Sequence, residues 1–217
     1  MRRTVHPEIL DSLQPDDPAA IANRRDLRLI NRIMGNFRWI ARQARTIRSE
    51  DQVIELGAGD GSLGSWLLAG GWLTQSHSYT GVDLWSRPTD WPRNWDWKQE
   101  DLLETEFAKG TTVLIANLIL HQFVDQQLRR IGRSINESRL RTLIIVEPSR
   151  RRFHLLMSRL LRVLGAHPIT LQDARTSIRA GFAGDDLVVA LGLDPDEWNI
   201  CQSETLTGAQ RYLCQRI

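Results

Sequence analysis

The sequence predicts an α/β domain built around a mostly parallel sheet that is covered by helices on both faces. From residue 51 onward, short apolar runs alternate with helical stretches, a pattern typical of repeated strand–helix–strand units. Two of the runs, Thr112–Asn117 and Thr142–Glu147, are almost continuously apolar, as strands buried on both faces should be. The length of 217 residues suits one such domain with a short extension.

That extension is predicted to be a helical cap ahead of the main domain. Asp17 can cap a helix that begins at the following proline. Apolar residues then recur at helical spacing over residues 19–48, and Gly35-Asn36 is expected to divide this stretch into two helices. We therefore expect an N-terminal helical cap over residues 1–48 and a main domain over residues 49–217.

The main domain is expected to contain seven strands. In chain order they are Val53–Leu56, Tyr79–Leu84, Trp95–Lys98, Thr112–Asn117, Thr142–Glu147, Trp198–Ser203 and Gln210–Ile217. Helices are expected at Leu63–Ala69, Gln122–Asn136, Arg151–Leu164 and Asp185–Leu191. The connection Leu206-Thr207-Gly208 is so short that the last two strands should form an antiparallel hairpin.

The composition is that of a globular protein and excludes several classes. A net charge of +2 gives no indication of nucleic-acid binding, and no run approaches the ~18–20 apolar residues of a membrane span. No apolar signal core follows Arg2 and Arg3, so we expect a cytoplasmic protein. Cys201 and Cys214 are too few for a disulfide framework or a zinc site, and no metal is expected.

A glycine-rich turn between the first predicted strand and the next helix is the most informative feature. Gly57, Gly59, Gly61 and Gly64 allow a sharp turn and let a ligand approach the main chain closely. The N–H groups at the start of the helix can face that ligand. Asp83 ends the second strand, where a carboxylate can accept hydrogen bonds from ribose hydroxyls. Together these features predict a nucleotide-type cofactor.

NAD and S-adenosylmethionine both bind turns of this kind. Gly59-x-Gly61-x-x-Gly64 satisfies the dinucleotide formula, but in that motif the first glycine follows the strand directly. Here the residue in that place is Gly57, and the spacing then puts Ser62 where a glycine or alanine is required. Glu55, inside the strand end, can hold the positively charged methionine end of S-adenosylmethionine, and this favours the sulfonium cofactor.

From about Asp51 to the C-terminus the sequence resembles the class I S-adenosylmethionine-dependent methyltransferase family. The family's first motif, an acidic residue followed by alternating glycines, is matched by Glu55-x-Gly57-x-Gly59-x-Gly61. The resemblance implies a Rossmann-like fold, with a seven-stranded, mostly parallel sheet and an antiparallel last strand. It also implies methyl transfer, as in the small-molecule, quinone-biosynthesis-like branch of the family.

The resemblance further implies which residues bind the cofactor. Asp83 matches the ribose-binding acid, and Leu84 or Trp85 would pack on the adenine. Asp101 would bind the adenine amino group, with the next residue stacking on the ring, and the end of the fourth strand would contact the methionine moiety. The full set of predicted cofactor-binding residues is Glu55, Gly57, Ala58, Gly59, Gly61, Asp83, Leu84, Asp101, Leu102, Asn117 and Leu118.

His121 is the candidate catalytic residue, because it follows the fourth strand at the edge of the sheet where ligands bind in such folds. An imidazole titrates near neutral pH, so it can take a proton from a phenol or an activated carbon. The alternative is that His121 only shapes the pocket. His154 and His167 are expected to have surface or core roles, and Asp173 lies in a segment that can form part of a lid.

The acceptor is predicted to be a small aromatic, quinone or polyketide-like molecule that is methylated on oxygen or carbon. Trp85, Trp91, Trp95 and Trp97 crowd one stretch, either as core packing or as an aromatic wall for a flat substrate. The segment Ser149–Leu164 reads as a basic amphipathic helix, either over the core or in contact with anionic lipid or a lipid-like substrate.

Three other functions remain open at this stage. One is an NAD(P)-dependent oxidoreductase, and another is a non-catalytic S-adenosylmethionine-binding subunit that activates a partner. The third is an RNA methyltransferase. The sequence Asn117-Leu118-Ile119-Leu120 is not the Asn-Pro-Pro-aromatic motif of enzymes that methylate exocyclic amines of bases, which argues against one branch of nucleic-acid methylation only.

Overall fold

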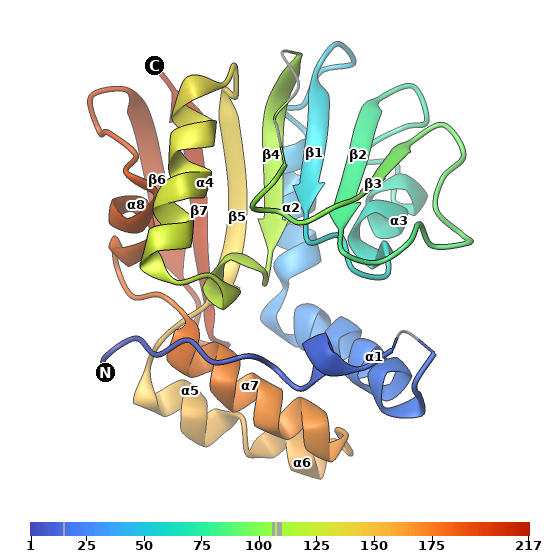
Figure 1. Cartoon of the computed structure of the whole chain (residues 1–217), viewed down its shortest axis with the longest axis vertical. Helices are drawn as coiled ribbons and strands as arrows, with labels where there is room; N and C mark the ends of the chain where they lie inside the picture. Colours follow the sequence, from blue (N-terminus) through green and yellow to red (C-terminus); the bar gives the residue numbers. More distant parts are fainter. Residues whose placement is uncertain (15, 106, 108–109) are drawn as a thin grey trace.

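The computed structural model contains a seven-stranded sheet with the strand order β3-β2-β1-β4-β5-β7-β6 (Figure 1). The structure describes residues 1–14, 16–105, 107 and 110–217. The strands are β1 (Gln52–Leu56), β2 (Ser78–Asp83), β3 (Asp96–Gln99), β4 (Thr111–Asn117), β5 (Thr142–Pro148), β6 (Trp198–Glu204) and β7 (Ala209–Arg216). Strands β1 to β5 pair in parallel, whereas β7 is antiparallel to both β5 and β6. The predicted sheet with its antiparallel hairpin is confirmed.

Helices cover both faces of this sheet, as the apolar strands require. Helices α2 (Asn36–Ala44) and α3 (Ser62–Ala69) lie on one face, and α4 (Asp125–Glu137) and α8 (Asp186–Leu191) lie on the other (Figure 1). The side chains of β4 alternate between the two layers, since Ile115 packs in the cluster that contains Ile40 and Leu114 packs in the cluster that contains Leu128. Within the described ranges, no helix has the length and apolar character needed to cross a bilayer.

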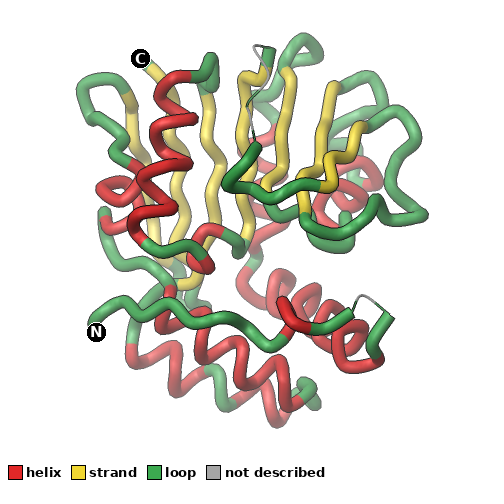
Figure 2. Tube along the Cα trace, viewed as in Figure 1, coloured by secondary structure: helices red, strands yellow, loops and turns green. Residues whose placement is uncertain are grey.

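A further group of helices gathers at the carboxyl ends of the parallel strands (Figures 1 and 2). It consists of α1 (Pro18–Met34), α5 (Arg152–Met157), α6 (Leu160–Val163) and α7 (Pro168–Ala180). The N-terminal segment, with the short 3-10 helix η1 (Leu10–Ser12), runs along α7. The cap is therefore built from two distant parts of the chain. The division at residues 48 and 49 stays a prediction, but α2 packs on the sheet and not in the cap.

The predicted helix cap and the predicted break between the first two helices are both confirmed. The Asp17 carboxylate accepts a hydrogen bond from the N–H of Ala19, at 2.7 Å, and so caps α1. Gly35 has a left-handed conformation, with φ of 67°, and separates α1 from α2.

The prediction of one helix over Arg151–Leu164 is wrong, because the helix stops at Met157 and resumes at Leu160. The reason is local. Ser158 is buried, and its hydroxyl donates to the carbonyl of Leu155 at 2.8 Å, where it competes with the helical backbone pattern.

Close contact between α4 and α8 makes Gly132 a sensitive position for stability. A Cβ on this residue would lie 1.8 Å from the carbonyl oxygen of Leu191, so the two helices would have to separate. We expect Gly132→Ala to lower the free energy of unfolding by about 1–3 kcal/mol, measured by urea denaturation. Arg133→Ala, on the exposed face of α4, is the matched control and should leave stability nearly unchanged. Equal stability of the two variants would contradict this packing.

Candidate active site

A large cavity lies between the carboxyl ends of the strands and the cap helices, with a volume of about 1330 Å³. Its sheet side is formed by the loops that follow β1, β2 and β4, and its cap side by the N-terminal segment, α1, α5 and α7. All the predicted cofactor-binding residues except Gly61 line it, and so does His121. The volume is above that of pockets for one drug-sized ligand, so it can hold a cofactor and an acceptor together.

The glycine-rich turn presents its backbone to this cavity. Gly57 and Gly59 have positive φ values of 65° and 58°, which a side chain would disfavour. A Cβ on Gly57 would collide with Ile119 at 2.5 Å, whereas a Cβ on Gly59 would have no atom within 4 Å. Gly59 therefore borders open space, and it is the point at which a ligand can approach the main chain.

The remaining glycine of the motif and three tryptophans serve packing. Gly61 precedes α3, and a Cβ on it would lie 2.7 Å from the ring of Trp91. Trp91 and Trp95 are buried, and Trp97 packs edge-on against Trp91. Of the four tryptophans in this stretch only Trp85 lines the cavity, so the interpretation of an aromatic wall is wrong for the other three.

Glu55 lies under the turn with only 2% of its surface exposed. The hydroxyl of Tyr79, on β2, donates to its Oε2 at 2.7 Å. Burial, followed by the nearby charges of Asp83 and Asp60, raises the pKa of Glu55 to about 8, although the Tyr79 hydrogen bond acts in the opposite direction. The carboxyl group is therefore ready to be ionised when a cationic group binds beside it.

Asp83, at the end of β2, holds the turn in place. Its Oδ2 accepts the Gly59 N–H at 2.7 Å, and its Oδ1 accepts the Trp85 N–H at 3.1 Å. Burial raises the pKa of Asp83 despite these hydrogen bonds. Farther along the cavity, Leu84 is largely exposed, and Asp101 accepts the backbone N–H of Leu103 at 2.8 Å.

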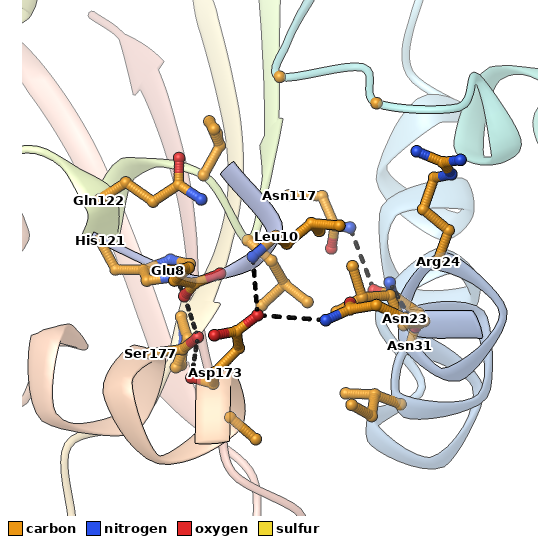
Figure 3. A pocket seen from close by; sticks show the side chains of 18 of the residues that line it. Glu8, Leu10, Asn23, Arg24, Asn31, Asn117, His121, Gln122, Asp173 and Ser177 are labelled. Carbon is orange, nitrogen blue, oxygen red and sulfur yellow. Dashed lines mark hydrogen bonds and ion pairs between the residues drawn. The ribbon is translucent and has the colours of Figure 1, made fainter. Parts of the chain in front are cut away.

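The turn after β4 contains backbone strain and an unsatisfied acceptor. Leu118 has φ of 58°, a left-handed conformation that is costly for a branched side chain. The amide nitrogen of Asn117 donates to Asn31 on α1 at 3.1 Å, which joins the turn to the cap (Figure 3). Its Oδ1 is buried and has no hydrogen-bond partner among the described residues. That oxygen is available to a donor in the cavity.

Glu147, at the end of β5, holds this strained turn. Its side chain is fully buried, and its two oxygens accept the backbone N–H groups of Ile119, Leu120 and His121 at 2.8–3.2 Å. Its Oε2 also lies 2.8 Å from Nδ1 of His121. One carboxylate thus sets the path of the main chain and the orientation of the imidazole.

His121 is held between two carboxylates. Besides Glu147, its Nε2 contacts Oε1 of Glu8 at 3.2 Å, and the hydroxyl of Ser177 on α7 donates to the same Glu8 oxygen (Figure 3). Burial lowers the pKa of His121, but the hydrogen bonds to Glu147 and Glu8 outweigh it and raise that pKa to about 10. The imidazole is therefore protonated at neutral pH.

Asp173 fixes the N-terminal segment that carries Glu8. Its carboxylate accepts the backbone N–H groups of Ile9 and Leu10, at 2.8 and 3.2 Å, and the side-chain amide of Asn23 on α1 at 3.2 Å (Figure 3). Asp173 therefore ties together the N-terminal segment, α1 and α7. The expectation that Asp173 lies in a lid element stays a prediction.

Sequence reasoning did not identify Glu8, Tyr79 or Glu147 as functional residues. A charged residue that ends the buried run Thr142–Glu147 was an available signal for Glu147, since charges are rarely buried without a partner. Glu8 lies in an irregular segment and has no local signal, because its role depends on a contact with a residue 113 positions away.

Three methyltransferases of known structure are similar in architecture to this chain. The plantazolicin methyltransferase BamL, solved with a substrate analogue and S-adenosylhomocysteine, matches with a TM-score of 0.69 and 10% identity, over 95% of this chain and 92% of its own. Magnesium protoporphyrin IX methyltransferase from Synechocystis, solved with S-adenosylhomocysteine, matches with a TM-score of 0.53 and 14% identity, over 89% and 86%. Human N-acetylserotonin methyltransferase, solved with S-adenosylmethionine, matches with a TM-score of 0.57 and 12% identity, over 95% of this chain and 61% of its own.

These likenesses show the fold of this chain. No family model and no curated protein matches the sequence. The chain has the Rossmann-like class I methyltransferase fold, as the sequence predicts.

The raised pKa of Glu55 predicts a pH dependence of stability. The folded pKa is about 8 and the ordinary value is 4.5, so between these values the folded state binds more protons than the unfolded state. The free energy of unfolding therefore falls as the pH rises through this window. In Glu55→Gln the Tm should fall less between about pH 5 and about pH 8 than in the wild type, measured by differential scanning fluorimetry. The control Glu197→Gln, at an exposed position, should show the same change of Tm with pH as the wild type. The same change of Tm with pH in Glu55→Gln as in the wild type would refute a raised pKa of Glu55.

Proposed function

We propose that this chain is an S-adenosylmethionine-dependent methyltransferase that acts on a small acceptor. The observation that carries the proposal is the arrangement at the ends of β1 and β2, where buried Glu55, the open backbone of Gly59 and the Asp83 carboxylate meet at one cavity. The class I fold, shared with proteins solved with this cofactor or its product, supports it.

The residues present fit this cofactor, which would supply an activated methyl group on a positively charged sulfur. The Asp83 oxygens accept backbone N–H groups of the turn and have lone pairs left for a ribose hydroxyl. Leu84, Asp101 and Leu102 border the region where an adenine would lie. The unpartnered Oδ1 of Asn117 can accept a hydrogen bond from the ammonium of the methionine end.

The proposed acceptor is largely apolar, with an aromatic, quinone or polyketide-like compound preferred and with oxygen or carbon as the methylated atom. Apolar side chains of the cap half of the cavity support this choice: Leu27, Ile30, Met157, Leu161 and Ile178. Such walls exclude water from the reacting groups and bind a flat, poorly hydrated molecule.

The protonation state of His121 changes the role proposed for it. An imidazolium has no free lone pair, so His121 cannot accept a proton while it is held between Glu147 and Glu8. We assign the acceptor's proton to Glu8, whose carboxylate lines the cavity and is oriented by His121 and Ser177. His121 then acts as a positioning residue that keeps Glu8 ionised and in place.

Cofactor binding is tested by thermal melting with S-adenosylhomocysteine and, separately, with NADH and NADPH. A ligand at a hundred times its Kd stabilises the folded state by about 2.7 kcal/mol. For a chain of this size we expect S-adenosylhomocysteine to raise Tm by about 5–10 °C. The shift should vanish in Asp83→Ala and persist in Asp96→Ala, an exposed aspartate at the start of β3.

The outcomes separate the other functions that the sequence leaves open. A shift with a nicotinamide cofactor alone would replace the proposal with an oxidoreductase. A shift with S-adenosylhomocysteine but no transfer to any small acceptor would favour either a cofactor-binding subunit or an RNA methyltransferase. Binding of RNA that weakens steeply with salt would identify the latter.

The role of Glu8 is tested by Glu8→Gln, with exposed Glu137→Gln as the control. A panel of phenols, hydroquinones and amines is first screened for compounds that the wild type methylates. With any such compound, kcat of Glu8→Gln should be lower by about 10²–10³, because the group that accepts the proton is lost. Loss of one carboxylate partner should also lower the pKa of His121, measured by NMR titration of its imidazole. Unchanged kcat together with an unchanged His121 pKa would rule out this role.

A further inference from the structure

Helices α5 and α6 lie in the part of the cap that is farthest from the sheet (Figure 1), and they expose apolar side chains. Phe153, Leu156, Leu160 and Leu164 are each at least half exposed, and Val163 is 83% exposed. In the same segment the polar residues His154 and Ser158 are turned inward and buried. This is the reverse of the pattern of a helix that packs its apolar face on a core. Clustered apolar side chains of this kind mark an interaction surface.

This apolar surface is continuous with the active-site cavity. Phe153, Met157 and Leu164 are exposed and also line the cavity. Leu206, in the loop between β6 and β7, is 89% exposed and lines it as well. The same loop lies against α5, because a Cβ on Gly208 would be 3.4 Å from the His154 ring. The exposed apolar side chains therefore form part of the rim of the cavity.

The charges around this surface are positive. Residues 149–171 contain five arginines and no aspartate or glutamate. Arg152, Arg159 and Arg162 are exposed, while Arg151 pairs with Glu204 and Arg150 with Asp186. A symmetric contact between two copies of this surface would bring arginines against arginines, which is unfavourable. Apolar side chains with arginines beside them instead match the acyl chains and phosphates of an anionic lipid surface.

We propose that α5, α6 and Leu206 form a docking surface for an anionic lipid bilayer. The exposed leucines, Val163 and Phe153 enter the interfacial region, and the arginines contact lipid phosphates. The rim of the cavity then faces the bilayer, so that an apolar acceptor can enter without crossing water. The docking itself does not depend on methyl transfer, whereas the entry of an acceptor rests on the proposed function.

Vesicle co-sedimentation of the full chain tests the docking surface. The wild type should bind vesicles of phosphatidylglycerol and phosphatidylcholine in equal parts, bind pure phosphatidylcholine much more weakly, and lose affinity as salt is raised. A variant with Leu156→Glu, Leu160→Glu and Val163→Glu should bind at least about tenfold more weakly. A variant with Arg152→Gln, Arg159→Gln and Arg162→Gln should lose the preference for phosphatidylglycerol.

Matched controls come from α4 and α8, which cover one face of the sheet and lie outside the proposed docking surface (Figure 1). Val189→Glu replaces a residue of α8 that is 68% exposed, and a variant with Arg129→Gln, Arg133→Gln and Arg139→Gln removes three exposed arginines from α4 and the loop after it. Both should bind vesicles like the wild type. If the triple glutamate variant does not fold, as judged by circular dichroism, Val163→Glu alone should still weaken binding.

Three results would overturn the proposal. They are no binding of the wild type to either kind of vesicle, equal losses in the control variants, and a wild-type dimer in light scattering that the triple glutamate variant converts to a monomer. The last result would assign the surface to a second copy of the chain. Because no cofactor is present in these assays, their failure leaves the proposed methyl transfer untouched.

Discussion

The buried carboxylate of Glu147 is the constraint on which the site depends. It accepts three consecutive backbone N–H groups after β4 and also contacts the His121 ring. A buried carboxylate is costly unless it is fully hydrogen-bonded, and here the cost is offset by donors that the turn must present in one geometry. Leu118, which has a left-handed conformation, is the strained residue in that turn.

Polar contacts connect this turn to elements that are distant in the sequence. His121 orients Glu8, and Asp173 holds the backbone beside Glu8 while also binding Asn23. The sheet provides strand ends on one side of the cavity, and the cap provides α1, α5, α7 and the N-terminal segment on the other.

Features that depend on neighbouring residues could be predicted from the sequence. Features that depend on contacts between residues far apart in the chain could not. Strand-turn-helix patterning located Glu55 and Asp83 correctly at the cavity, because strand ends in a parallel sheet share one edge. The spacing of Trp91, Trp95 and Trp97 is equally compatible with a core and with a wall, and only packing against Tyr79 and α3 decides between them. The association of α5 to α7 with α1, and the contribution of Glu8, arise from tertiary contacts that no local pattern encodes.

The position of Glu8 also determines when the site can form during synthesis on the ribosome. Glu8 is made before its partners His121 and Ser177, which follow 113 and 169 positions later. The segment that carries Glu8 can complete these contacts only after strands β1 to β5 and α7 have been synthesised, since long-range contacts need the intervening chain. Folding of the segment around Glu8 on its own cannot build this side of the cavity, because the partners of Glu8 lie on η2 (Leu120–Gln122) and α7.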